Sequence, residues 1–322
     1  MIKAVILFSI GLALLIKGGD WFVDGAVGVA HRYRLPEILI GATIVSIGTT
    51  IPEVMVSSIA AAVGQSQTAY GNAIGSCICN TALIAAITIA AKSSADIDTK
   101  SFRTPIAFFF LAAVFYSAVA YITGTFSRAI GVLLLVLFVI YMTITIRQAI
   151  KTRGVKDEEE AEEEEKPLWK NIVLLLVGAA VIALGANLLV DNGKIIALGL
   201  GVPESVVALT FIALGTSLPE LVTAITSLIK GHSSLSLGNI IGANLFNLVF
   251  VSGMAITIRP FSIPSDKTIA GMNASLLVDI PVMFLTMAIM TVPALCTKKL
   301  RRYQGILLLA IYAAYILFQF FF

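Results

Sequence analysis

Long apolar stretches constrain this chain more than any other feature of its sequence. An α-helix needs about 20 apolar residues to cross the hydrocarbon core of a bilayer. Stretches of that kind, separated by Pro, Gly or charged residues, lie at about 4–28, 37–62, 70–91, 104–122, 127–149, 169–193, 204–229, 236–257, 271–292 and 303–321. We therefore predict an all-α membrane protein of ten transmembrane helices.

The composition supports a membrane environment and excludes most soluble classes. Of the 322 residues, 58% are hydrophobic and 13% are charged, whereas a soluble domain is about one quarter charged. Eight of the 19 acidic residues lie in a single run, 157–165, so only 11 are spread over the rest of the chain. Soluble enzymes, nucleic-acid-binding proteins and disordered scaffolds are excluded. The sequence indicates no cofactor and no obligate protein partner; the lipid bilayer is the expected surrounding.

Lysine and arginine residues predict which way the spans face. Sixteen of them flank one side of the predicted membrane and five flank the other. Because short cytoplasmic loops carry the excess of positive charge, both termini are predicted outside, in a multi-pass protein of the plasma membrane. The acidic loop, 151–168, is then cytoplasmic, and we expect it to be a solvated segment.

The sequence repeats itself at an offset of 167 residues. Between 17–80 and 184–247, 18 of 64 positions are identical. The predicted organisation is a first five-helix repeat at 1–150, the acidic loop at 151–168 and a second five-helix repeat at 169–322. Five spans is an odd number, so the two repeats have inverted topology. Many secondary transporters are built this way and work by alternating access, although a passive cation channel remains an alternative.

Spans 2 and 7 each carry a Gly-Thr-(Thr/Ser)-x-Pro-Glu segment in the middle of the membrane. Proline lacks an N–H and clashes with the preceding turn, so we expect helices 2 and 7 to be broken there. The breaks would free the carbonyl groups of Thr49 and Thr216 to act as ligands. Glu53 and Glu220 follow directly, and an ionised carboxylate at the bilayer centre costs about 2.5–3.5 kcal/mol. These carboxylates therefore need cations or protons.

Spans 3 and 8 carry a second matched pattern, Gly-Asn-x-Ile-Gly-(Ser/Ala), which leads to Asn80 and Asn247. Ser76 and Asn80 are four residues apart and share one helix face. Together with the glutamates they form an all-oxygen set that suits hard cations such as Ca²⁺, which takes about six to eight oxygen ligands. Two glutamates offset the charge of one Ca²⁺, and Na⁺ ions or protons could replace it at the same carboxylates.

These paired segments, at about 41–80 and 208–247, resemble the two alpha-repeats of the sodium/calcium exchanger family, within the Ca²⁺:cation antiporter superfamily. The short central loop makes the resemblance one to its prokaryotic type. The resemblance implies that spans 2, 3, 7 and 8 form a core across which spans 1 and 6 slide. It also implies that several Na⁺ ions enter for each Ca²⁺ expelled.

The resemblance also implies a role for each matching residue. Glu53 and Glu220 are expected to bind both Ca²⁺ and Na⁺, and the carbonyl groups of Thr49 and Thr216 to bind Ca²⁺. The expected further Na⁺ ligands are the hydroxyl groups of Thr50, Ser217 and Ser76 and the backbone oxygens of Ser46 and Ala213.

Asn80 and Asn247 are expected to line the central position, and here the chain departs from some relatives. Potassium-dependent members have aspartate at position 247, and proton-coupled relatives usually place a glutamate in spans 3 and 8. The two asparagines therefore argue against K⁺ co-transport and favour Na⁺ over H⁺. Ala243 stands where the family often has serine, so one Na⁺ position has lost a hydroxyl ligand. The alternative function is a Ca²⁺/H⁺ antiporter in which the same glutamates carry protons.

An intramembrane enzyme is a different class with little support. Gly18-Gly19-Asp20 misses the Gly-x-Gly-Asp motif of intramembrane aspartyl proteases because position 17 is lysine. The sequence carries no Gly-x-Ser-x-Gly, His-Glu-x-x-His or Walker loop. We therefore expect no enzymatic activity.

Overall fold

The computed structural model describes residues 1–92, 97–152, 167–201, 215–264, 268–269 and 271–321. Nearly all of them are helical, with π-helical segments (η) inside four of the long helices. The helical elements are α1 (Ile2–Arg32), α2 (Glu37–Ile40), η1 (Gly41–Val45), α3 (Ser46–Ala62), α4 (Ser66–Cys79), η2 (Asn80–Ala85), α5 (Ala86–Ala91), α6 (Thr99–Thr123), α7 (Arg128–Thr152), α8 (Leu168–Gly199), α10 (Leu218–Ile229), α11 (Ser233–Phe246), η4 (Asn247–Val251), α12 (Ser252–Ile258), η5 (Ser275–Asp279), α13 (Ile280–Thr297) and α14 (Arg302–Phe321).

Eight helical runs in the described part of the chain are long and apolar enough to cross a membrane. The helix α14, of 20 residues, covers the last predicted span. The seventh predicted span is described only in its second half, where α10 lies, because 202–214 fall outside the described residues. Two short antiparallel pairings complete the structure. They join β1 (Thr125–Phe126) to β2 (Phe261–Ser262) and β3 (Thr268–Ile269) to β4 (Met272–Asn273).

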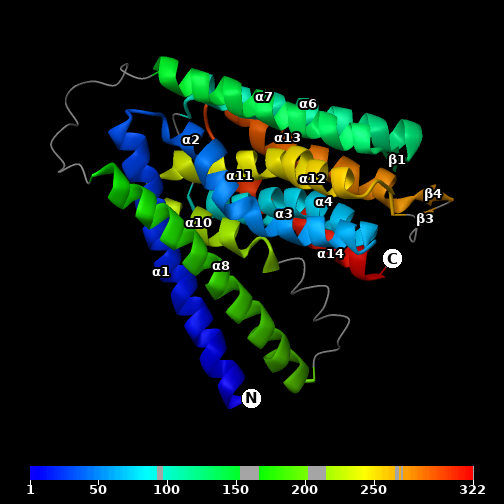
Figure 1. The fold of residues 1–322 in the computed structure, drawn as a ribbon, viewed down its shortest axis with the longest axis horizontal. Coiled ribbons are helices and arrows are strands. Elements are labelled where there is room, and N and C mark those ends of the chain that lie inside the picture. Colours follow the sequence, from blue (N-terminus) through cyan, green and yellow to red (C-terminus); the bar gives the residue numbers. More distant parts are fainter. Residues whose placement is uncertain (93–96, 153–166, 202–214, 265–267, 270, 322) are drawn as a thin grey trace.

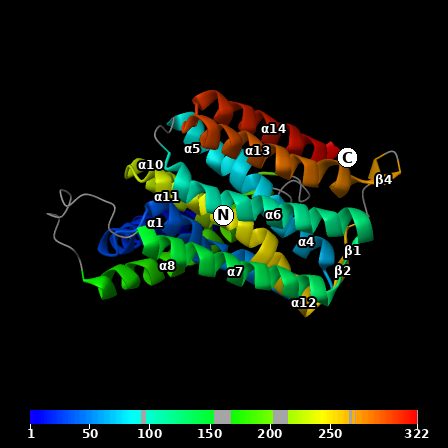
Figure 2. The same ribbon diagram turned by 90° about the horizontal axis from the view of Figure 1, so that it is seen from above.

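The helices that carry the two repeated motifs pack on one another in the middle of the molecule (Figures 1 and 2). Glycine allows the closest of these contacts. A Cβ atom on Gly238 of α11 would lie 2.3 Å from the carbonyl oxygen of Ile38, and one on Gly41 would lie 2.4 Å from that of Leu235. Small residues at such crossings let helix backbones approach closely inside a membrane. The core is therefore held by direct backbone contact between the two repeats.

Helices α1 and α8 form a separate antiparallel pair along one side of the core (Figure 1). They are the two longest helices, at 31 and 32 residues. Gly11 and Gly185 face each other where they cross: a Cβ atom on either would lie 2.8 Å from the carbonyl oxygen of the other. Gly18 and Gly25, seven and fourteen residues after Gly11, also lie against α8. A glycine-lined face thus lets these two long helices pack together as one unit.

The prediction that helix 2 is broken was wrong. The helix α3 continues from Ser46 to Ala62 with Pro52 inside it. One proline removes one i→i−4 hydrogen bond, here to the Gly48 carbonyl, and the bonds on either side are enough to keep the segment helical. The local irregularity lies earlier, in the π-helical segment η1. In span 7, residues 216–217 form a turn and α10 begins at Leu218.

Two further π-helical segments begin at equivalent positions of the two repeats. The segment η2 begins at Asn80 and η4 begins at Asn247, which are separated by the repeat offset of 167 residues. Single-turn π segments are rare and occur frequently at functional sites. The two asparagines singled out by the sequence therefore sit where both helices depart from regular geometry.

Candidate cation-binding site

Two buried glutamates lie at the centre of the candidate site. Glu53 lies within α3 and Glu220 in the first turn of α10, and both side chains are 0% exposed. None of their four carboxylate oxygens has a hydrogen-bond partner. The two carboxyl groups are close enough for their charges to interact. Buried charges in proteins are paired or coordinate metals, so this arrangement calls for a positively charged ligand.

Hydroxyl groups from both repeats surround the glutamates. The side chains of Thr49 and Thr50 lie near the Glu220 carboxyl group, although they belong to the other repeat. Thr50 and its counterpart Ser217 are buried, and neither hydroxyl oxygen has a hydrogen-bond partner. These oxygens are in the state expected of groups whose partner is a cation.

The two asparagines share this property. Asn80 and Asn247 are both 0% exposed, and their amide oxygens and nitrogens have no hydrogen-bond partner. The segment that begins at Asn80 packs against α10, and the segment that begins at Asn247 packs against α3. Each asparagine therefore lies on a segment that contacts the glutamate-bearing helix of the opposite repeat. A single central site built from both repeats requires such contacts between them.

The structure adds two residues that the sequence analysis did not select. The hydroxyl group of Thr216 donates to Asn72 Oδ1 at 3.2 Å, and that of Thr49 donates to Asn239 Oδ1, also at 3.2 Å. Both bonds cross between repeats. The signal was present in the sequence, because Asn72 and Asn239 are identical residues at the repeat offset.

The remaining predicted ligands, Ser76, Ser46 and Ala213, have no described contact with the two glutamates. Ser76 lies in α4, one turn before Asn80, and is 3% exposed. The single hydroxyl proton of Ser46 has three acceptors within reach: the carbonyl oxygens of Gly41 and Asn239, at 2.8 Å and 2.9 Å, and Asn239 Oδ1 at 3.2 Å. Ala213 lies outside the described residues. The structure thus connects the threonines and glutamates through contacts, whereas Ser76 is placed only by its position on the helix.

Asp279 is held by residues outside this site, whereas the Cys79 thiol lies beside it. Asp279 accepts hydrogen bonds from Ser275, Tyr315 and Gln319, at 2.7, 3.1 and 2.9 Å. Cys77 and Cys79 are free and buried, and the Cys79 thiol lies near Ser217 and the two glutamates. Within the described residues no three His, Cys, Asp or Glu side chains are grouped as a metal site. A metal ion at the two glutamates would therefore take most of its ligands from neutral oxygens.

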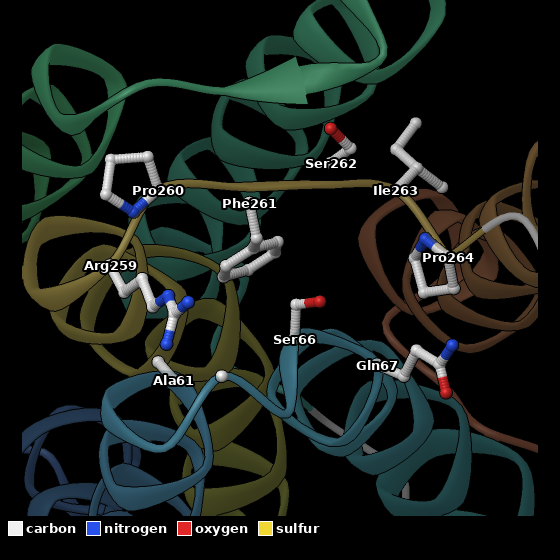
Figure 3. A pocket seen from close by; sticks show the side chains of 10 residues that line it. Ala61, Ser66, Gln67, Arg259, Pro260, Phe261, Ser262, Ile263 and Pro264 are labelled. Carbon is white, nitrogen blue, oxygen red and sulfur yellow. The ribbon is translucent and has the colours of Figure 1, made fainter.

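Two hollows in the described part of the structure lie away from the predicted ligands. One, of about 430 Å³, lies between the turn after α3 and the segment 259–264, with Arg259, Ser66 and Phe261 among its lining residues (Figure 3). The other, of about 270 Å³, is mostly apolar and lies between α1, α7 and the start of span 2. Neither is lined by a predicted cation ligand. The two glutamates are instead buried among packed helices.

Comparison with known proteins decides the family. The profile of the sodium/calcium exchanger protein family matches residues 3–147 and 170–321. The chain belongs to the sodium/calcium exchanger family. The two matched segments leave out only 148–169 and the chain ends, so the match covers both predicted repeats.

Relatives and solved structures agree with this exchanger assignment. The chain is 34% identical to the putative antiporter CaxA of Alkalimonas amylolytica, over 98% of each chain. It is 28% identical to the sodium/calcium exchanger MaX1 of Methanosarcina acetivorans, again over 98% of each. Its fold is similar to that of the sodium-calcium exchanger NCX_Mj soaked with Na⁺, with a TM-score of 0.81, 31% identity and 98% coverage of both chains. This exchanger is thus a multi-pass membrane protein of a cation antiporter family.

Proposed function

We propose that this exchanger is a secondary-active antiporter that exchanges Na⁺ for Ca²⁺ by alternating access at one shared carboxylate site. The observation that carries the proposal is the pair Glu53 and Glu220: fully buried, at equivalent repeat positions, with four oxygens that lack hydrogen-bond partners. Two carboxylates neutralise one Ca²⁺, and the surrounding neutral oxygens suit its preference for about six to eight oxygen ligands. Na⁺ ions bound at the same carboxylates would displace it.

The proposed ligand set follows the two repeats. Glu53 and Glu220 would bind both cations, with the carbonyl groups of Thr49 and Thr216 on Ca²⁺. Asn80 and Asn247 would line the central position. The proposed Na⁺ ligands are Thr50, Ser217, Ser76 and the backbone oxygens of Ser46 and Ala213.

We propose inverted topology for the two five-helix repeats. The cross-repeat bonds of Thr49 and Thr216 and the π-helical segments at Asn80 and Asn247 support two equivalent repeats. The antiparallel course of the equivalent helices α1 and α8 supports their inversion (Figure 1). The paired helices α1 and α8 would move together across the core, since their glycine-lined contact joins them to each other. Such rocking around a fixed site is the usual route to alternating access.

The proposed orientation places both termini outside the plasma membrane and the acidic loop in the cytoplasm. The excess of Lys and Arg on the loop side supports it. The end of α7 and the start of α8, which flank the acidic loop, lie at one end of the bundle, and the C-terminus lies at the other (Figure 1).

A counter-ion test separates this proposal from a passive cation channel. Purified protein is reconstituted into Na⁺-loaded vesicles, and ⁴⁵Ca²⁺ uptake is measured in a medium free of Na⁺. We expect uptake to require internal Na⁺ and to be accompanied by ²²Na⁺ release. If more than two Na⁺ exchange for each Ca²⁺, an inside-positive potential should accelerate uptake, because each surplus charge is worth about 2.3 kcal/mol per 100 mV. Equal Ca²⁺ uptake without any internal counter-ion would contradict antiport.

A further inference from the structure

Two asparagines tie the repeats together at the cation site. Asn72 lies on α4 and Asn239 on α11, each on the helix that follows a glutamate-bearing helix. Each accepts, through Oδ1, a hydrogen bond of 3.2 Å from the threonine of the opposite repeat. Those threonines, Thr49 and Thr216, are the residues whose carbonyl groups are proposed to hold Ca²⁺.

A bond to the threonine hydroxyl also constrains the threonine backbone. Threonine is branched at Cβ and has few allowed χ1 rotamers. Fixing its Oγ1 therefore restrains the orientation of the peptide groups beside it. At Thr216 this restraint falls on the turn just before α10, where the regular helical hydrogen bonds have not yet begun.

Asn72 makes contacts to the first repeat as well. Its Nδ2 donates to the backbone carbonyl oxygen of Glu53 at 3.2 Å and to Ser57 Oγ at 2.8 Å. A carboxamide has two N–H donors, so both are used. One side chain thus joins the Glu53 backbone to Thr216, which are ligand-bearing segments from opposite repeats.

Asn239 lacks the equivalents of the two bonds that Asn72 donates through Nδ2. Its Oδ1 also lies 3.2 Å from Ser46 Oγ, but its Nδ2 is buried without a partner. The residue that corresponds to Ser57 in the second repeat is Ala224, which has no hydroxyl group to accept the bond. The bridge between the ligand segments is therefore complete at Asn72 only.

We propose that Asn72 is a positioning residue for Ca²⁺: it fixes the spacing between the Glu53 and Thr216 segments so that both can bind one ion. This inference rests on the proposed Na⁺/Ca²⁺ exchange. Ca²⁺ must collect about six to eight oxygens at 2.3–2.6 Å, which requires both segments to be in place at once. The Thr216 carbonyl group belongs to the proposed Ca²⁺ ligands but not to the proposed Na⁺ ligands, so loosening the bridge weakens Ca²⁺ binding more than Na⁺ binding.

The test is a double-mutant cycle on Asn72→Leu and Thr216→Val. The Leu side chain has the shape of Asn without its hydrogen bonds, and Val has the shape of Thr while leaving the carbonyl group in place. Steady-state ⁴⁵Ca²⁺ uptake gives the KM for Ca²⁺, the maximal rate and the Na⁺ concentration for half-maximal drive. Asn192→Leu is the matched control, because Asn192 bonds only within α8, to the Leu188 carbonyl oxygen.

We expect Thr216→Val to raise the KM for Ca²⁺ by about 3- to 10-fold. Asn72→Leu is expected to raise it by about 10-fold, and the double variant no further, because the two residues share one bond. The maximal rate and the Na⁺ dependence should each change by less than about 2-fold, a pattern that general loss of structure does not produce. The control should resemble the unsubstituted protein.

Other outcomes overturn the inference. Multiplicative effects in the double variant, equal losses of Ca²⁺ and Na⁺ affinity, or a lower maximal rate at unchanged KM would each contradict positioning. If Asn72→Leu does not fold, Thr216→Val decides alone: an unchanged KM for Ca²⁺ refutes the bridge. Failure of the proposed function is separately visible, because the unsubstituted protein would then show no Na⁺-dependent uptake.

Discussion

The two repeats carry the same proposed Ca²⁺ ligands but differ in a residue behind them. Glu53 and Glu220 have equivalent burial and equivalent unpartnered oxygens, and the same holds for Asn80 and Asn247. In contrast, Ser57 in the first repeat corresponds to Ala224 in the second. The residues proposed to bind Ca²⁺ are thus duplicated, whereas Ser57, which supports Asn72, has no counterpart hydroxyl in the second repeat.

The loops that follow the glutamate helices differ in the same way. In the second repeat, Lys230 Nζ lies 2.7 Å from Asp24 and 3.4 Å from Asp20 of α1. The corresponding residue in the first repeat is Val63, which carries no charge. Only the second-repeat loop therefore forms this ionic link to the helix proposed to move. The two repeats can therefore share the same Ca²⁺ ligands and still differ in how their loops contact the neighbouring helices.

The largest expected effect comes from the residues that the repeats share. Glu53→Gln and Glu220→Gln each leave one carboxylate to offset a divalent cation. Each should reduce Ca²⁺ uptake by at least about 100-fold, because losing a direct ligand exceeds the 10- to 100-fold cost of losing an outer-shell partner. ⁴⁵Ca²⁺ uptake into Na⁺-loaded vesicles measures this. Near-normal uptake by either variant would show that the substituted glutamate is not a required Ca²⁺ ligand, and that the two glutamates are not equivalent.

A smaller effect is expected where one hydroxyl is missing. Ser76 corresponds to Ala243 in the second repeat, and both are buried. Ala243→Ser should lower the Na⁺ concentration for half-maximal exchange by about 3- to 5-fold, and Ser76→Ala should raise it by a similar factor, which is the range of one hydrogen-bonding group. Unchanged Na⁺ titrations for both would show that these positions do not bind Na⁺.

Exchanging the supporting residues should give a still smaller change. Ser57→Ala removes one of the two acceptors of Asn72 Nδ2 and reproduces the second-repeat arrangement. We expect the KM for Ca²⁺ to rise by about 2- to 3-fold, the range of one partly buried hydrogen bond. Ala224→Ser should lower it by a similar factor, because it offers Asn239 an acceptor. If both variants raise the KM for Ca²⁺, or both lower it, the proposed difference between Ser57 and Ala224 is refuted.

The smallest expected effect is a pH dependence of stability at His232. Its Nδ1 lies 2.8 Å from Glu37 Oε1, and this hydrogen bond is the main cause that raises the pKa of His232 above its usual value. Asp24 also raises the pKa of His232, and Lys230 lowers it. The stabilisation is therefore complete below the unfolded pKa of about 6.5 and is lost as pH rises through the higher folded value.

Thermal unfolding of His232→Gln measures this effect, since Gln65 is the corresponding residue of the first repeat. The variant should unfold at a lower temperature than the unsubstituted protein at pH 5.5. The difference should shrink as pH rises above the folded pKa of His232. A difference that grows with pH would have the opposite sign and would contradict the assignment. His31 Nε2 lies 3.9 Å from the same carboxylate, so His31→Gln serves as the comparison.

The membrane fold could be predicted in large part because hydrophobic length is a direct signal. The span predicted at 37–62 corresponds to α2, η1 and α3, which cover the same residues. What failed was the local geometry at Pro52: a proline predicts a missing hydrogen bond, but the neighbouring bonds determine whether the helix stops. The π-helical turns also have no simple sequence pattern.

The candidate site was predictable where chemistry and repetition coincided. Glu53 and Glu220 combine a costly buried charge with a duplicated motif, and each is buried without a hydrogen-bond partner. Asn72 and Asn239 were equally duplicated, but asparagine on a helix also packs through hydrogen bonds to neighbouring helices. Their partners lie 144 and 190 residues away in sequence, so only the three-dimensional structure reveals the bridge.

The central claim is most directly tested by comparing two driving gradients on the same vesicles. ⁴⁵Ca²⁺ uptake is measured under an outward Na⁺ gradient and, separately, under an outward H⁺ gradient of equal size. The account predicts uptake driven by Na⁺ and none above background driven by H⁺, because neutral asparagines occupy positions 80 and 247. Uptake driven only by the H⁺ gradient would contradict it and would make Glu53 and Glu220 the proton carriers of a Ca²⁺/H⁺ antiporter.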